Sequence, residues 1–389
     1  ANSRAMQLAG IDARTPAPAG GRILHRADGT PTGVFVDKAE DLVSRVIPVA
    51  DREQYVLWFR SAMRHMLELG LTGMHDAGVT RAQVDAYRWL LQRGELLVRV
   101  YAMHDARPDS EDAGALQAAL RLGPQDFDPT GRLALRSVKF AMDGALGSRG
   151  AALLEPYSDE PEVRGLLQHT PEELRQQFLP LHRAGFQIAV HAIGDEANRL
   201  CLDVFEDIQK EAPRDDARHR IEHAQVLSAA DIPRFAALQV IPSMQPTHCT
   251  SDMPWAPRRL GPSRIEGAYA WRALRQTGVI LPAGSDAPVE SINPLLGIHA
   301  AVTRQTVERQ PPGGWSPAQR LSRSEAVRAF TAWAAQASFS EQDLGTLEVG
   351  KWLDLSVFDE DILLCDAQDL LQARALLTVV GGAIEYDGR

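Results

Sequence analysis

The chain has few cysteines and none of the patterns that cysteines form in disulfide-stabilised proteins. Its three cysteines, Cys201, Cys249 and Cys365, are far apart and odd in number. No CxxC pair occurs, so a disulfide framework is excluded and a reducing compartment is indicated. We therefore expect a cytoplasmic protein.

Several other features are missing as well. No apolar run reaches about 18 residues, so no membrane-spanning helix and no membrane partner are expected. The formal net charge is −10, and a negative surface repels phosphate backbones, which argues against a nucleic-acid partner. A glycine-rich GxGxxG turn is absent, so a nucleotide-binding open sheet has no support.

Short apolar segments rich in β-branched residues alternate with helical segments along most of the chain. The predicted strands are 71–75, 97–103, 133–140, 186–191, 219–223, 238–243 and 279–284. Capping boxes at Thr170–Glu173 and Ser322–Glu325 predict two helix starts, and a further helix is predicted from Ser228. Alternation of this length indicates an α/β fold with a parallel sheet.

Polar side chains end several of these strands, which favours a closed barrel over an open sheet. Lys139, His191 and His223 end three strands, and Asp286 follows the segment 279–284. A barrel gathers functional groups from the C-terminal ends of many strands, whereas an open sheet gathers them at one switch point. We predict a TIM-like (β/α)₈ barrel in which seven strands are visible and the first is missing.

The barrel is predicted to occupy residues 1–338, with a β-hairpin near 22–36 and a helical stretch over 38–68. Residues 339–389 contain short strands and turn glycines, and are predicted to form the C-terminal part of a small β-sandwich domain. The size of such a fold is compatible with a homodimer, but the oligomeric state stays open.

Strand alternation predicts which side chains face the barrel axis. In 186–191, the residues Gln187, Ala189 and His191 share the inward face. In 133–140, Lys139 is expected to share a face with Leu133, Leu135 and Ser137.

Lys139, His191, His223 and Asp286 form the predicted metal site. A divalent cation lowers the pKa of a bound water toward about 7 and needs imidazole and carboxylate ligands. Each residue also has a structural interpretation: the histidines as core residues, Asp286 as a turn residue and Lys139 as a chain reaching solvent. Their joint occurrence at strand ends favours the metal site. A neutral lysine can take up carbon dioxide and become an anionic carbamate ligand, so carboxylation of Lys139 is a hypothesis.

The segment 244–270 follows a strand and is expected to lie above the barrel mouth, where loops determine substrate specificity. Within it, His248, Asp252 and Trp255 are candidate substrate contacts, with simple loop packing as the alternative. Arg149 either binds a substrate carboxylate or holds the loop after Lys139 in place.

The segments VKFAMDGALGSRGAAL, HAIGDEAN, RIEHAQ, PAGSDAPV and GTLEVGKWLDLSVFD resemble the amidohydrolase superfamily, and most closely its YtcJ-like branch, amidohydrolase family 3. The resemblance implies a distorted barrel with a β-sandwich, one or two divalent metals (usually zinc), and hydrolysis of amide or related C–N bonds. It also implies that Lys139 is a carboxylated bridging ligand and that His191 and His223 bind one metal. Asp286 would be both a ligand and the general base.

One departure from the family pattern is that no HxH pair occurs, since His75 and His104 stand alone. The pattern places that pair on a strand before Ala1, so we expect either a truncated gene product or part of a longer protein, with weakened metal binding and an unpaired sheet edge. The resemblance implies an amidohydrolase acting on a small-molecule substrate with an amide, formamide, imide or urea-like bond, and two alternatives to it stay open. One is a deaminase of the same superfamily, and the other is a truncated, non-catalytic remnant that binds ligand or a partner subunit.

Overall fold

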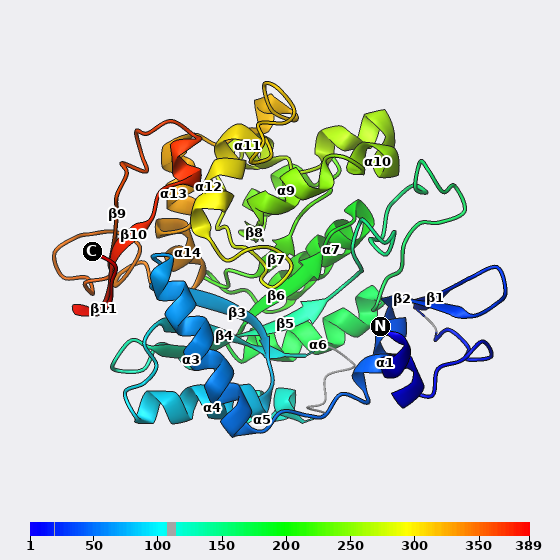
Figure 1. The fold of residues 1–389 in the computed structure, drawn as a ribbon, viewed down its shortest axis with the longest axis horizontal. Helices are drawn as coiled ribbons and strands as arrows, with labels where there is room; N and C mark the ends of the chain where they lie inside the picture. The colour runs from blue at the N-terminus through cyan, green and yellow to red at the C-terminus, as the bar shows by residue number, and fades with distance from the viewer. Residues whose placement is uncertain (19, 107–113) are drawn as a thin grey trace.

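The computed structural model describes residues 1–18, 20–106 and 114–389, and a curled parallel sheet lies at its centre (Figure 1). The six strands follow the order β3-β4-β5-β6-β7-β8, so each strand pairs with the next one along the chain. They are β3 Gly73–Val79, β4 Arg99–Asp105, β5 Leu133–Ala141, β6 Gln187–Ala192, β7 Arg220–His223 and β8 Ile241–Ser243. Strand, helix and parallel strand in this repeated order make the TIM-like barrel fold that the sequence predicts.

The prediction of a regular strand at 279–284 is wrong. This segment pairs with β8 through a single parallel bridge between Met244 and Ala283. The Met244 N–H donates to the Pro282 carbonyl at 2.9 Å, and the Gly284 N–H donates to the Met244 carbonyl at 2.9 Å. Pro282 has no N–H with which to extend the ladder. The segment still runs beside β8, and within the described residues no ladder joins it to β3.

Helices surround the sheet, with α3–α6 below it and α9–α12 above it in Figure 1. The helices are α1 Ser3–Leu8, α2 Asp41–Ser44, α3 Arg52–Glu68, α4 Arg81–Gln92, α5 Ala115–Leu122, α6 Pro171–Arg183, α7 Asp195–Glu211, α8 Ile232–Ala237, α9 Pro246–Asp252, α10 Ala256–Arg264, α11 Trp271–Gln276, α12 Pro294–Thr303, α13 Arg323–Ala329 and α14 Ala332–Ala337. The predicted helical stretch 38–68 is therefore divided between a short 3₁₀ turn, α2 and α3.

The capping boxes that open α6 and α13 are confirmed, with Thr170 and Ser322 as the N-caps. The helix predicted from Ser228 instead begins at Ile232, after a turn. The Ser228 hydroxyl accepts a hydrogen bond from Arg199 at 3.0 Å, and Asp231 takes the N-cap position.

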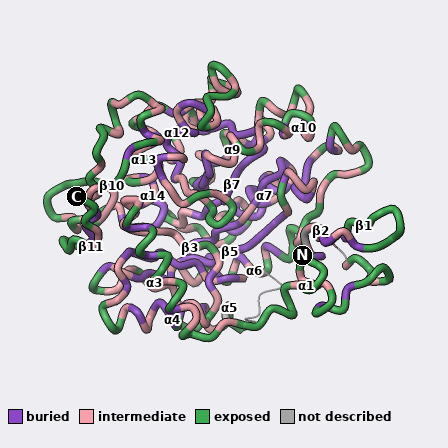
Figure 2. The backbone as a smooth tube through the Cα atoms, in the orientation of Figure 1, coloured by how far each residue is buried: buried purple, intermediate pink, exposed green. Residues whose placement is uncertain are grey.

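Buried side chains lie on both faces of the sheet, and the strands are among the most buried parts of the chain (Figure 2). Ile188 and Val190 of β6 point outward into the layer shared with the helices. Ala189 points inward and packs with Tyr101 and Met103 inside the barrel. The predicted alternation of β6 is therefore confirmed.

The alternation predicted for β5 is wrong because this strand contains a bulge. Tyr101 pairs with Ala134, and Met103 pairs with Ser137, so β5 holds one extra residue between these two pairs. As a result, Leu133 and Leu135 belong to the outer cluster that contains helix side chains. Lys139 lies on the opposite, inward face, in register with Ala189 of β6.

The C-terminal residues form a separate antiparallel sheet in the order β11-β10-β9, with β9 Leu355–Phe358, β10 Ala375–Val380 and β11 Ala383–Asp387. Arg99 of β4 anchors it through a fork to Asp354, with both N–O distances 2.7 Å. The hairpin of β1 Gly21–His25 and β2 Pro31–Asp37 has the predicted form and lies on the other side of the molecule in Figure 1. The domain boundary at 338/339 stays a prediction.

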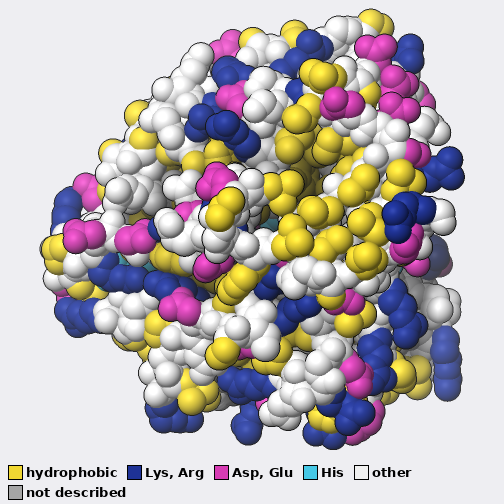
Figure 3. Space-filling model, turned by 90° about the vertical axis from the view of Figure 1, so that its left-hand side faces the viewer, with side chains coloured by type: hydrophobic (Ala, Val, Ile, Leu, Met, Phe, Trp, Pro, Cys, Tyr) yellow, Lys and Arg dark blue, Asp and Glu magenta, His cyan; other side chains and the backbone are white. Residues whose placement is uncertain are grey.

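Apolar side chains gather on the face seen in Figure 3, which is the side where the C-terminal sheet lies. Exposed apolar residues near the C-terminus include Leu347, Val349, Leu363 and Leu364. Exposed apolar patches often mark contact surfaces, but the homodimer stays a prediction. None of the described helices is both long and apolar enough to cross a bilayer.

Candidate metal centre

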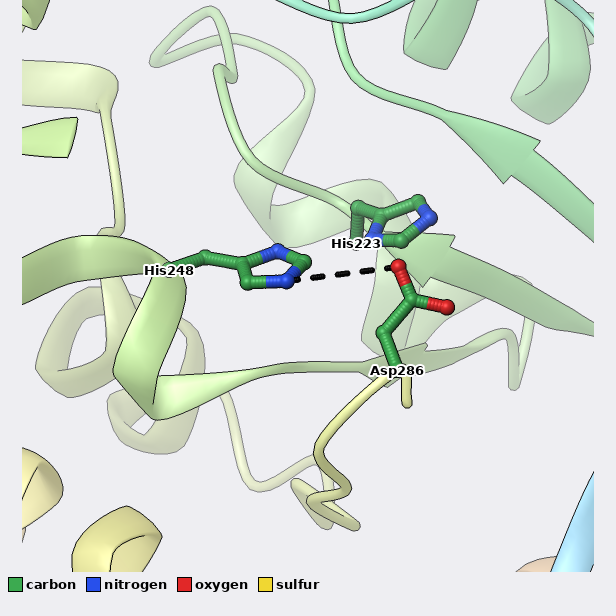
Figure 4. A group of neighbouring side chains, drawn as sticks. All are labelled: His223, His248 and Asp286. Atoms are coloured by element: carbon green, nitrogen blue, oxygen red, sulfur yellow. Dashed lines mark ion pairs between the residues drawn. The ribbon is translucent and has the colours of Figure 1, made fainter. Parts of the chain in front are cut away.

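Three side chains with metal-binding atoms converge at the C-terminal edge of the sheet (Figure 4). His223 ends β7, His248 lies on α9, and Asp286 follows the extended segment beside β8. Their candidate ligand atoms all lie within 4.8 Å of one another. His248 Nε2 is 4.0 Å from Asp286 Oδ2, and Figure 4 shows this imidazole pointing toward the carboxylate.

The backbone at His223 turns its side chain into this site. In β7 the inward positions are Arg220 and Glu222, which pair in register with Ala189 and His191. Simple alternation would therefore place His223 on the helix side. His223 instead has a φ of 77°, in the left-handed region, and its ring lies against the ring of His191 with centroids 4.5 Å apart. Strain of this kind is concentrated at functional sites.

His223 has the protonation state that a metal ligand needs. Burial and the positive charge of Lys139 together lower its pKa to about 4, against the opposing influence of Glu222 and Gln245. Its Nδ1 lies 2.7 Å from the Gln245 side-chain oxygen, which can only accept a hydrogen bond. The proton is therefore on Nδ1, and Nε2 keeps a lone pair.

His248 and Asp286 complete the group from two further elements. Burial lowers the pKa of His248 to about 4, so its imidazole is also neutral near pH 7. Burial raises the pKa of Asp286, while electrostatic interactions with His248 and Lys139 oppose this shift. Asp286 has a φ of 55°, and its side chain is 40% exposed. A carboxylate beside two neutral imidazoles is thus open to solvent.

His191 lies next to this group but is not a member of the set of mutually close ligand atoms. Its Nε2 is 3.5 Å from Asp143 Oδ1. Asp143 is buried, and its carboxylate accepts hydrogen bonds from the backbone N–H groups of Ala152, Ile193 and Gly194 at 2.8–2.9 Å. Asp143 therefore joins the loops that follow β5 and β6 and fixes the surroundings of His191.

Lys139 faces the barrel interior, where its ammonium donates to the Phe140 carbonyl at 3.2 Å. Its charge lowers the pKa values of both His223 and Asp286, so it lies within electrostatic range of the group. Deeper in the barrel, Arg220 forms an ion pair with Glu222, in which Nη2 donates to Oε2 at 3.1 Å and Nε lies 2.8 Å from Oε1. Arg220 also donates to Nδ1 of His75 at 2.9 Å.

The donor set fits a divalent cation. Zinc binds histidine nitrogen and carboxylate oxygen at about 2.0–2.2 Å in tetrahedral geometry, so two ligands of one ion lie about 3.4 Å apart. The His248–Asp286 distance of 4.0 Å and the 4.8 Å bound on the whole group are wider than this, so the three side chains would move closer together on binding one ion. His248 Nε2 is buried and makes no hydrogen bond within the described residues. A buried nitrogen without a hydrogen bond is costly unless another partner binds it.

The predicted substrate residues lie in different settings. Asp252 follows His248 on α9 and accepts hydrogen bonds from Tyr269 and Gln225. Trp255 packs against Gly147, whose missing Cβ would come within 3.3 Å of the indole ring. Arg149 forms ion pairs with two acidic side chains, Asp159 at 3.0 Å and Glu160 at 3.0 Å. These pairs occupy the guanidinium within the loop itself, and substrate binding by these residues stays a prediction.

Sequence reasoning placed His248 among substrate contacts and missed Gln245, Glu222 and Asp143 altogether. His248 lies only five residues after β8, so the strand-end argument used for the other ligands also applies to it. Glu222 was detectable, since alternation in β7 places it inward. No sequence signal marks Gln245, because its role depends on the turn at His223.

Comparisons with known proteins show the family to which this chain is similar. The sequence profile of the amidohydrolase family matches residues 1–386. The chain belongs to the amidohydrolase family. The Bacillus subtilis (strain 168) protein YtcJ, named as an amidohydrolase, is 33% identical over 393 residues, which are 99% of this chain and 72% of YtcJ. The N-substituted formamide deformylase of Arthrobacter pascens is 26% identical over 399 residues, covering 100% of this chain and 71% of that enzyme.

A solved structure is similar to this member of the amidohydrolase family over most of its length. The crystal structure of an uncharacterized metal-dependent hydrolase from Pyrococcus horikoshii OT3 has a TM-score of 0.76 and 28% identity. The match covers 94% of this chain and 70% of that one. The resemblance to the YtcJ-like branch is thus confirmed, and metal-dependent hydrolysis is supported as the general chemistry.

Proposed function

We propose that this amidohydrolase-family protein hydrolyses a C–N bond of a small molecule, in an amide, formamide, imide or urea-like group, with a divalent cation held by His223, His248 and Asp286. Zinc is the proposed metal, and His191 and Lys139 are proposed as further ligands. The convergence of two neutral imidazoles and a carboxylate at the end of a barrel sheet carries the proposal. The similarity to an N-substituted formamide deformylase supports the bond type.

When bound, the cation supplies Lewis acidity, which polarises a carbonyl group and makes a water molecule more acidic. The protein's own residues then supply orientation and proton transfer. Asp286 is accessible to solvent, and its raised pKa makes it a stronger base than an ordinary carboxylate. We propose that it accepts a proton from the attacking water and passes it to the leaving nitrogen as the C–N bond breaks.

Lys139 has two proposed states. As a carbamate, formed from its neutral amine and carbon dioxide, it would add an anionic ligand to a group that otherwise contains one carboxylate. As an ammonium, it would repel the cation. A ¹³C carbamate signal on protein prepared in labelled bicarbonate is expected, and a Lys139→Ala protein with full metal content and activity would contradict the carboxylated form.

The function is tested with zinc-reconstituted protein and a panel of formamides, acyl amides, cyclic imides and ureas, with amine release as the measurement. We expect turnover of at least one class, loss of activity with a chelator, and recovery with zinc. Ammonia release from amino-substituted heterocycles alone would support the deaminase alternative. Stoichiometric zinc without any turnover would support the non-catalytic remnant.

A further inference from the structure

Asp252 lies one helical turn beyond His248 on α9. Residues four apart on a helix share a face, so the Asp252 carboxylate is a neighbour of the proposed metal ligand. Glu290 interacts electrostatically with both residues, since its negative charge raises the pKa of each. Asp252 therefore borders the site without belonging to the group of candidate ligands.

Two side chains hold the Asp252 carboxylate by one of its oxygens. Tyr269 Oη and Gln225 Nε2 both donate to Oδ2, the latter at 3.0 Å. Gln225 also donates to the Tyr269 hydroxyl at 2.6 Å, which closes a triangle of hydrogen bonds. Within the described residues, Oδ1 accepts no hydrogen bond. The triangle therefore fixes the direction in which the second oxygen points.

The two donors are themselves buried and held by further hydrogen bonds. Tyr269 is 3% exposed, and Gln225 is 4% exposed. The Tyr269 N–H donates to the Gln225 carbonyl at 2.7 Å, and the Tyr269 carbonyl accepts from the buried Arg304 at 3.0 Å. A carboxylate with a fixed direction loses little conformational entropy when it binds a ligand.

The charge of Asp252 is only partly compensated. Burial and the negative charge of Glu290 together raise its pKa to about 6, against the lowering influence of the hydrogen bonds from Tyr269 and Gln225. The group is thus mainly ionised near pH 7, and no cationic side chain forms an ion pair with it among the described residues. Burial without a countercharge is costly, and an incoming cation would reduce that cost.

We propose that Asp252 is a specificity-determining residue whose Oδ1 binds a protonated amine of the substrate, so that the preferred substrates are amides or formamides bearing a cationic amino group. This inference rests on the proposed function, because it assigns the substrate class of the same site. A purely structural Asp252, which only holds Tyr269 and the turn after β7, is the competing outcome.

An isosteric ligand pair tests the inference: N-(2-aminoethyl)formamide, which carries an ammonium at neutral pH, and N-propylformamide, which carries a methyl group instead. Dissociation constants are measured by ligand-observed NMR, and kcat/KM is measured on the zinc-loaded protein. We expect the ammonium ligand to bind about tenfold more tightly, as one partly buried ion pair allows. If turnover is absent, the proposed function fails, but the binding ratio still decides this inference.

Asp252→Asn keeps an oxygen for Tyr269 and Gln225 but presents an amide N–H where Oδ1 was, so the preference should fall to about unity. Glu290→Gln is the matched control, since it removes the same unit charge nearby and should keep the preference within about threefold. Asp252→Ser is a second variant that should also lose the preference. A wild-type ratio near unity, or equal weakening of both ligands in the Asp252 variants, would overturn the proposal.

Discussion

His223 Nδ1 lies 2.7 Å from the Gln245 side-chain oxygen, so the last residue of β7 is oriented by the residue that precedes α9. Gln245 occupies the N-cap position of α9, yet its side chain makes no capping bond there. Partners of this kind fix the tautomer of a metal-binding histidine. The structure thus assigns Gln245 to the site rather than to the helix.

Replacing Gln245 with Leu should weaken zinc binding by about 10–100-fold, because the acceptor that orients His223 is lost. Gln245→Glu keeps an acceptor of the same length and should retain most of the affinity. The measurement is competition for zinc against a chromophoric chelator. Equal affinities of the Leu variant and the wild type would show that Gln245 does not orient the ligand.

The ion pair between Arg220 and Glu222 should be essential for stability. Their side chains are 4% and 8% exposed. Burial raises the pKa of Glu222, but the charge of Arg220 outweighs this and leaves it lowered. Arg220→Met leaves a buried carboxylate without its partner and should reduce the free energy of unfolding by about 3–5 kcal/mol, measured in urea. The double variant Arg220→Met/Glu222→Leu should recover part of this loss, and no recovery would contradict the ion-pair explanation.

The barrel was predictable from the sequence because strand ends and helix caps are local signals. The capping boxes at Thr170 and Ser322 and the alternation in β6 were all identified correctly. The bulge in β5 was not, since the extra residue between Ala134 and Ser137 follows from pairing with β4, which no local pattern encodes. The segment 279–284 pairs with β8 through only a single bridge among the described residues, because Pro282 has no N–H to donate. The sequence analysis gave this proline too little weight.

A buried histidine pair should contribute to acid sensitivity. The Ile188 N–H donates to His219 Nδ1 at 3.0 Å, so His219 carries its proton on Nε2 and donates to His182 Nδ1 at 2.9 Å. His182 Nε2 then donates to the Ala212 carbonyl at 2.6 Å. Burial lowers the pKa of both histidines, and the chain of bonds requires both to be neutral.

Because these folded-state pKa values lie below the unfolded value near 6.5, the unfolded chain binds more protons as the pH falls below about 6.5. The stability contribution is therefore present above this pH and is lost below it, with a slope of up to about 1.4 kcal/mol per pH unit for each proton. His219→Gln should unfold with a shallower dependence on pH between 5 and 7 in urea titrations. An unchanged slope would show that other groups cause the acid sensitivity.

The site was only partly predictable, because its residues are brought together by backbone geometry that no local sequence pattern encodes. His223 and Asp286 were identified from their positions at strand ends, and both are in the group. His248 was assigned to substrate binding because the segment 244–270 was predicted to be a loop above the barrel mouth, and the helix α9 that carries His248 was not predicted. The left-handed backbone at His223, which brings its ring to His191, also has no local sequence signature.

The central claim is that His223, His248 and Asp286 hold a divalent cation, and zinc content measured by mass spectrometry tests it most directly. After zinc loading and dialysis, the wild type and the surface control His65→Ala, whose side chain is 61% exposed, should keep at least about one equivalent per chain. The double variant His223→Ala/His248→Ala should keep almost none while remaining folded. Equal zinc content in the double variant and the wild type would contradict the proposed metal centre.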